Sequence, residues 1–182
     1  TEVYVAILAE EDVGENEATR RLGEMMTGPG LAASTATTGR VNLLAASMGL
    51  FKVNVTALLD FNNLTGLTLA TIANNSVVRP KKMVGTIKVI PYGVPESDLE
   101  AARAIIDRHK PLVEVKPFVV RQATLITTGS QAARQKVIEG FTPPLRERME
   151  RYGAILVEGP YVSEDEAAIS RALQSALDSG AE

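Results

Sequence analysis

The spacing of hydrophobic residues changes several times along the chain, and each change marks an expected element. Residues 1–8 form a mostly apolar run that predicts a strand. Residues 15–26 have helical spacing, with a buried stripe expected at Ala18, Leu22, Met25 and Met26. Residues 28–39 are rich in Gly, Thr, Ser and Ala, which is typical of a loop or an irregular edge.

The middle of the chain is dominated by short β-type runs. We expect strands over residues 41–45, 49–55, 67–72 and 84–90, with one short helical turn at residues 57–59. Asn-rich and Gly-containing breaks separate these runs. Pro95 then opens a predicted helix that ends near His109, and residues 112–115 read as a connecting strand.

The last third of the chain alternates strand and helix. Residues 119–126 and 154–157 are the predicted strands, and residues 131–139 begin the first helix, which Pro143-Pro144 is expected to interrupt before residues 146–152. Ser163 and Glu166 have the spacing of a capping box before the last helix, which Gly180 ends. This order predicts a parallel sheet. The expected fold is therefore α/β and α+β, with a β-rich α+β unit at residues 1–115 and an α/β unit at residues 116–182.

The candidate ligand site lies where the first of these late strands meets its helix. Thr127, Thr128, Gly129 and Ser130 follow the apolar run and precede the helical spacing. In a parallel sheet such a loop lies at the carboxyl edge, where ligands bind, and the helix N-terminus attracts phosphate. An ordinary helix cap after an ordinary strand is the alternative, because Thr-Gly-Ser is a short motif.

Composition narrows the function further. The 182 residues carry a net charge of −3, so no global field attracts nucleic acid or an anionic membrane. The chain has no cysteine and one histidine, His109, which argues against zinc and against a serine triad. No apolar run is long enough for a membrane span, and the N-terminus has no signal-peptide charge pattern, so we expect a cytoplasmic protein without a membrane partner.

The late segment resembles the first half of the molybdopterin-binding domain of molybdopterin molybdenumtransferases and adenylyltransferases. The family's opening strand ends in Thr-Gly-Ser, a glycine precedes its second strand, and a Val-Pro-Asp-Asp-x-x-x-Ile motif follows. The residues that fit are Thr128, Gly129, Ser130, Gly153, Val162, Asp165 and Ile169. Residues 39–62 and 70–91 are also similar to the leading region of a molybdopterin-binding subfamily. Two departures are Gln131 after the Thr-Gly-Ser motif and Glu164 in place of the first aspartate.

The resemblance implies molybdopterin as the cofactor, a pterin phosphate as the ligand, and a role in molybdenum cofactor biosynthesis or delivery. The implied ligand-binding residues are Thr127, Thr128, Gly129, Ser130, Glu164 and Asp165. No catalytic residue and no protein-only metal site are identified. Two interpretations of these carboxylates are open. In one, Glu164 or Asp165 joins the ligand phosphate in an oxygen-only Mg²⁺ site; in the other, both carboxylates serve only the helix N-terminus.

The resemblance also implies that the chain is a fragment, inactive by itself, because the family's second, Gly-Gly-rich loop would follow Glu182. A sheet of two or three parallel strands leaves an edge unpaired, for which we expect pairing across a homo-oligomer. The competing hypothesis is a non-catalytic module in which the β-rich half mediates assembly and the α/β half keeps its architecture without a working site.

Overall fold

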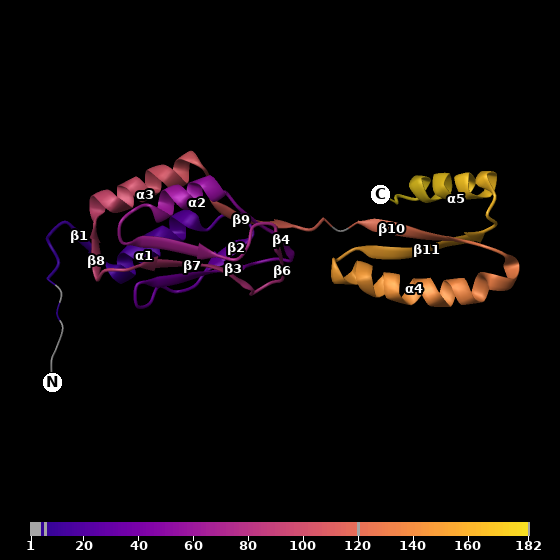
Figure 1. Cartoon of the computed structure of the whole chain (residues 1–182), viewed down its shortest axis with the longest axis horizontal. Coiled ribbons are helices and arrows are strands. Elements are labelled where there is room, and N and C mark those ends of the chain that lie inside the picture. Colours follow the sequence, from indigo (N-terminus) through magenta and orange to yellow (C-terminus); the bar gives the residue numbers. More distant parts are fainter. Residues whose placement is uncertain (1–4, 6, 120, 182) are drawn as a thin grey trace, which may run out of the picture. The chain divides into compact units, whose positions relative to one another are not determined.

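The structure is a computed structural model that describes residues 5, 7–119 and 121–181. The chain divides into two compact units, Thr1–Pro117 and Phe118–Glu182. The described residues form five α-helices and eleven strands in mixed sheets, which confirms the predicted α/β and α+β fold class (Figure 1). The division falls two residues after the expected boundary at residue 115.

The first unit is built around a four-stranded antiparallel sheet with the order β2-β3-β7-β5. Three of its strands match predicted runs, and β2 forms the irregular edge. The strands are β2 (Leu31–Ala33), β3 (Arg40–Ala45), β7 (Met83–Val89) and β5 (Leu67–Thr71). Alternation is regular, so that Val41, Leu43 and Ala45 of β3 are buried while the residues between them face outward.

A second sheet has the order β6-β4-β9 and is also antiparallel. Its strands are β6 (Val77–Val78), β4 (Gly49–Val53) and β9 (Val113–Pro117). A further two-stranded pair joins β1 (Asp12–Gly14) to β8 (Gly93–Pro95). The strand predicted over residues 1–8 lies partly outside the described residues. Residues 5, 7 and 8 are not in a strand, and the first strand begins at Asp12.

Three helices cover the buried sides of these sheets (Figure 1). They are α1 (Glu15–Met26), α2 (Val55–Asn62) and α3 (Glu96–Arg108). Helices α1 and α3 match the predicted boundaries, and Pro95 is the residue before α3. The single turn predicted at residues 57–59 was too short, because the Asn54 side chain accepts a 3.1 Å hydrogen bond from the Ala57 N–H and caps an eight-residue helix.

The second unit alternates strand and helix as predicted. Its elements are β10 (Gln122–Thr128), a 3₁₀ turn η1 (Gln131–Ala133), α4 (Arg134–Arg151), β11 (Ile155–Val162) and α5 (Glu166–Asp178). The strands β10 and β11 pair in parallel, with Ala123 opposite Leu156 and Thr128 opposite Val162. Figure 1 shows α4 and α5 on opposite sides of this strand pair.

The predicted interruption of α4 at Pro143-Pro144 is wrong, because the helix runs through both prolines. Proline lacks the N–H that would bond the carbonyl four residues earlier, and its ring crowds that carbonyl. The two carbonyls concerned belong to Glu139 and Gly140, which are both exposed. Solvent can hydrate these carbonyls, which lowers the cost of keeping a continuous helix.

The core of the second unit is small. Among its described residues, the buried hydrophobic ones are Leu156 on β11 and Ala172 on α5, and the buried polar one is Thr142. Several apolar side chains of the same two elements remain largely exposed: Ile155 (55%), Val157 (38%), Leu173 (52%) and Leu177 (60%). Across the described ranges of the chain, no helix combines the length and apolar character needed to cross a membrane.

Candidate functional site

The candidate residues gather at one edge of the β10–β11 pair. Thr127 and Thr128 end β10, and Glu164 and Asp165 follow the end of β11. Because the strands are parallel and Thr128 lies opposite Val162, both segments leave the sheet at its carboxyl edge. A 3.2 Å hydrogen bond from the Gly129 N–H to the Val162 carbonyl links them. The structure thus brings together the two parts of the sequence-predicted site.

Gly129 and Ser130 form the turn between β10 and the following helical segment. Gly129 has a φ of +151°, a conformation that side-chain-bearing residues rarely adopt, and Ser130 is the residue before η1. A Cβ atom on Gly129 would lie 2.4 Å from the Tyr161 hydroxyl. That hydroxyl donates a 2.8 Å hydrogen bond to the Ser130 carbonyl. Sequence reasoning missed Tyr161, which packs over the turn.

The turn presents unused hydrogen-bond donors. In the part of the chain that the structure describes, the N–H groups of Ser130, Gln131 and Ala132 have no protein acceptor. Arg134 and Lys136 are exposed in the next turn, which contains no acidic residue. The positive end of the helix dipole repels cations at the helix N-terminus. An anionic ligand, in contrast, would be attracted both by these cations and by the positive end of the dipole. The arrangement is therefore chemically suited to an oxyanion.

A hollow of about 450 Å³ adjoins these donors. Its lining comes from η1 and the first turns of α4, and it includes Gln131, Arg134, Gln135 and Ile138. A volume of this size is within the usual range for small-molecule sites. Arg134 was not singled out from the sequence, although its position four residues after Ser130 on the expected helix was a usable signal.

The two carboxylates of the site have different surroundings. Asp165, and not Ser163, is the residue that caps α5, because its side chain accepts a 2.9 Å hydrogen bond from the Ala168 N–H. The predicted capping box at Ser163 and Glu166 is therefore wrong by two residues. Glu164 is exposed and forms no ion pair with another described residue.

Metal binding by protein groups alone finds no support among the described residues, where no three His, Cys, Asp or Glu side chains cluster suitably. A Mg²⁺ ion at Glu164 or Asp165 would need ligand oxygens to complete its shell. His109 lies in the first unit at the end of α3, with its Nε2 atom 3.9 Å from an Asp60 carboxylate oxygen. It is thus not part of the turn.

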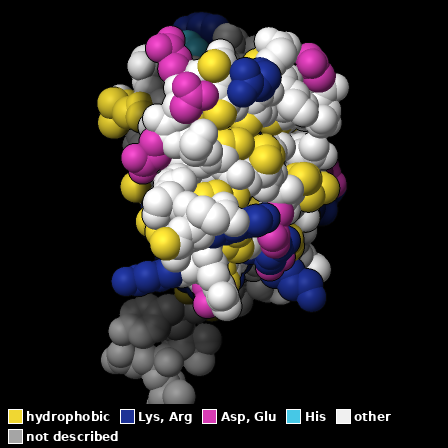
Figure 2. Space-filling model, turned by 90° about the vertical axis from the view of Figure 1, so that its right-hand side faces the viewer, with side chains coloured by type: hydrophobic (Ala, Val, Ile, Leu, Met, Phe, Trp, Pro, Cys, Tyr) yellow, Lys and Arg dark blue, Asp and Glu magenta, His cyan; other side chains and the backbone are white. Residues whose placement is uncertain are grey.

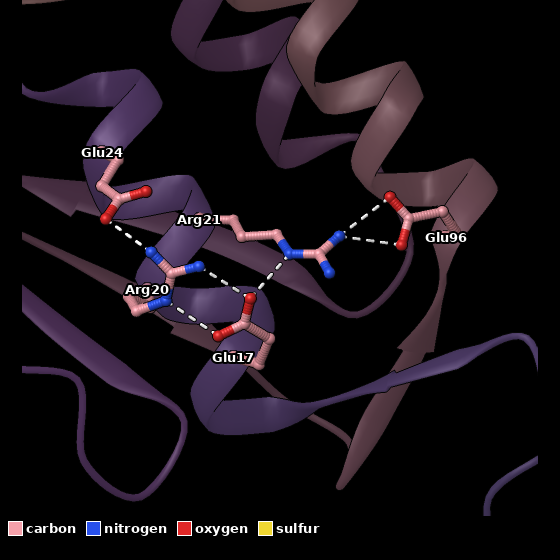
Figure 3. A network of polar contacts seen from close by, with 5 residues as sticks. All are labelled: Glu17, Arg20, Arg21, Glu24 and Glu96. Atoms are coloured by element: carbon pink, nitrogen blue, oxygen red, sulfur yellow. Dashed lines mark hydrogen bonds and ion pairs between the residues drawn. The ribbon is translucent and has the colours of Figure 1, made fainter.

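A second polar feature is the ion-pair network on α1 (Figure 3). Glu17 accepts hydrogen bonds from Arg20 (2.7 and 2.8 Å) and from Arg21 (2.9 Å). Arg20 also reaches Glu24 at 2.5 Å, and Arg21 reaches Glu96 of α3 at 2.9 and 3.0 Å. Hydrogen bonds from Arg20 and then Arg21 lower the pKa of Glu17 to about 2, and those to Glu17 raise the pKa of both arginines.

A cavity of about 570 Å³ lies beside this network, between α1 and the segment around β2. Its charged lining residues Glu17, Arg20 and Glu24 bond one another. These charged groups pair with one another, and their side chains remain largely exposed. The network is therefore best explained as a set of surface ion pairs within α1 and from α1 to α3.

The molecular surface on the side of the α4 and α5 starts mixes hydrophobic, basic and acidic side chains (Figure 2). No large field of a single sign covers this view, in keeping with the net charge of −3. Compared with known proteins, the chain matches no protein-family model, no curated protein and no solved structure. The resemblance to molybdopterin-binding domains therefore stays a prediction from the motif residues.

Proposed function

We propose that the second unit binds a phosphorylated pterin of the molybdopterin type, as part of molybdenum cofactor biosynthesis or delivery. The observation that supports this most is the turn at Gly129 and Ser130. It offers three unpaired N–H groups beside Arg134 and Lys136, at the sheet edge that also carries Glu164. Phosphate is one of the oxyanions that such a turn is suited to bind.

Each residue has a distinct part in this proposal. The N–H groups of Ser130, Gln131 and Ala132 donate to phosphate oxygens, while Arg134 and Lys136 balance the phosphate charge. The hydroxyls of Thr127, Thr128 and Ser130 extend the polar surface around the ligand. Molybdopterin, when bound, supplies the group that holds molybdenum. Asp165 keeps its role as the α5 cap, and Glu164 is the carboxylate available to a Mg²⁺ ion shared with the phosphate.

The test is a titration of the 182-residue chain with molybdopterin, with binding followed by calorimetry. We expect saturable binding that Gly129→Val weakens about tenfold or more, because a side chain both strains the turn and meets Tyr161. Gly153→Val is the matched control. Gly153 also has a positive φ (+74°), with open space around it, but it precedes β11 at the other end of the strands.

A second pair of variants tests the charges. Arg134→Gln/Lys136→Gln should weaken binding strongly, whereas Arg148→Gln/Arg171→Gln removes the same charge from elsewhere in the unit and should leave it nearly unchanged. Circular dichroism establishes that each variant is folded. Equal binding by a folded Gly129→Val protein would overturn the proposal.

The alternative function is a non-catalytic assembly module. The sequence hypothesis assigned assembly to the β-rich half, whereas the exposed apolar side chains of β11 and α5 favour an assembly surface on the second unit. Under this alternative two copies of the chain pair through this surface, which gives the homo-oligomer expected from the sequence. Light scattering would then show a dimer that Leu173→Glu/Leu177→Glu dissociates, while Val55→Glu/Leu59→Glu, equally exposed on α2, would not. A dimer that shows no saturable molybdopterin binding would favour this module.

A further inference from the structure

The outward face of the four-stranded sheet carries polar residues in a regular arrangement. Helices and core residues cover the face that bears Val41 and Ile87, whereas the alternate residues point away from the core. Across β3, β7 and β5 these alternate residues form two rows, Arg40–Lys88–Thr68 and Asn42–Thr86–Ala70.

Arg40 and Lys88 are direct cross-strand neighbours. The backbone N–H and C=O groups of Arg40 both bond Thr37, on the side away from β7. The Arg40–Lys88 pair is therefore of the non-hydrogen-bonded kind, in which opposing side chains approach most closely. Two like charges in this position destabilise the sheet unless something else neutralises them.

No neutralising group is found among the residues that the structure describes. The four strands β2, β3, β5 and β7 contain no Asp or Glu. Within the described ranges, neither Arg40 nor Lys88 forms an ion pair, although Lys88 is only partly exposed. Two cationic side chains at directly opposed cross-strand positions repel each other when no carboxylate lies with them, and an external anion would relieve that repulsion.

The space in front of these cations is shaped and equipped with further donors. A hollow of about 440 Å³ is lined by Arg40, Asn42, Thr68, Thr86 and Lys88, together with Ala70 and Met83. Thr86 Oγ1 donates a 2.9 Å hydrogen bond to Asn42 Oδ1. This bond turns the Asn42 amide so that its Nδ2 group, which has no acceptor among the described residues, remains free to donate.

We propose that this face is a second ligand site, specific for a small molecule that carries a phosphate or another compact oxyanion. Arg40 and Lys88 neutralise the anion, and the Asn42 amide and Thr68 hydroxyl complete its hydrogen bonds. The hollow is of small-molecule size, and two cations on a chain of net charge −3 make a poor track for nucleic acid. The site belongs to the first unit and does not depend on molybdopterin binding by the second.

The experiment is an NMR titration of the ¹⁵N-labelled 182-residue chain with inorganic phosphate and, in parallel, pyrophosphate at low salt. We expect saturable shifts of the Asn42, Thr68 and Thr86 amides. Arg40→Gln and Lys88→Gln should each weaken this response about tenfold or more, because each removes a charge-assisted contact. Lys88→Arg should retain binding. Shifts at Gly129 and Ser130 report the other site separately, so the two proposals fail independently.

The control is Arg103→Gln/Lys116→Gln, which removes the same charge from α3 and β9. If this control weakens the phosphate response as much as Arg40→Gln/Lys88→Gln does, the effect is one of net charge and the proposal is overturned. It is also overturned by unchanged binding in the folded Arg40→Gln/Lys88→Gln variant, or by loss of binding in Lys88→Arg.

Tighter binding of a single-stranded oligonucleotide through the same residues would replace the small-molecule ligand with nucleic acid. A tighter response to pyrophosphate than to phosphate would identify a ligand with more than one phosphate group.

Discussion

The two units bury their apolar residues to very different degrees. In the first unit, strands from two sheets and three helices enclose large side chains such as Phe51, Phe61 and Leu22, all fully buried. The second unit packs two helices against only two strands, and every residue of β10 is partly exposed. Both units show a clear hydrophobic pattern in the sequence, so the pattern alone does not reveal whether an element finds enough partners.

This difference bears on where ligands bind. A parallel sheet is ordinarily buried on both faces, and a two-stranded one leaves its strand edges and part of its apolar surface open. The turn at Gly129 therefore lies in the part of the chain with the lower packing density, where local opening costs least. The outward face of the four-stranded sheet, which carries Arg40, is in contrast supported from behind by the buried core of the first unit.

The largest expected effect comes from truncating a core side chain in each unit. Phe51→Ala should lower the free energy of unfolding by about 4 kcal/mol, because a fully enclosed ring leaves a cavity. Leu156→Ala should cost about 2 kcal/mol, since its surroundings can collapse. Urea denaturation followed by residue-specific amide exchange measures both. If Phe51→Ala destabilised the amides of β10 as strongly as those of β4, the two units would not be independent.

A smaller effect concerns the cap of α5. Asp165→Ala should lower stability by about 1 kcal/mol, because the Ala168 N–H loses its acceptor. Ser163→Ala should change stability by less than about 0.5 kcal/mol, since Ser163 does not cap the helix. Thermal melts monitored by circular dichroism measure both variants. The reverse order of effects would restore the capping box expected from the sequence.

The smallest effect is a pH dependence of the first unit. The pKa of Glu17 is lowered from 4.5 to about 2 by its arginine partners, so the ion pairs favour the folded state above pH 4.5. That contribution should decline as the pH falls from 4.5 toward 2. Glu17→Gln should flatten this part of the stability profile, whereas Glu100→Gln, exposed on α3, should not. Because these groups are exposed, added salt should reduce the difference.

The sequence predicted elements best where one periodicity runs uninterrupted. The strands around Val41, Leu69 and Ile87 and the helix beginning at Glu15 have such patterns, and they appear near the expected bounds. The predicted length of α2 was too short because Val55 and Leu59 are apolar but exposed, so the apolar residues of this helix do not fall on one face. The pairing of β1 with β8 joins residues about eighty positions apart, and neither segment has a strong β pattern.

The Gly129 turn and the Arg40–Lys88 pair also differ in how far each could be predicted from the sequence. The turn at Gly129 could be placed from the sequence, because a strand, a glycine and a helix follow one another within a few residues. Tyr161 was missed since its contact with Ser130 depends on the parallel register. Arg40 and Lys88 are 48 positions apart, and only the antiparallel register of β3 and β7 makes them neighbours. Sequence patterns locate strands but do not specify which residues face each other.

The two prolines within α4 interrupt the hydrogen bonding of this helix near its middle. The carbonyls of Glu139 and Gly140 cannot accept the usual helical bonds from residues 143 and 144, so the hydrogen-bond ladder has a gap at that point. Beyond the gap, Arg146 bonds Glu158 and the Leu156 carbonyl on β11, which anchors the carboxyl-terminal half. The amino-terminal half, which bears Arg134, continues from that anchored half across two missing helical hydrogen bonds, so the hydrogen bonding of α4 is weakest between Arg134 and the anchor.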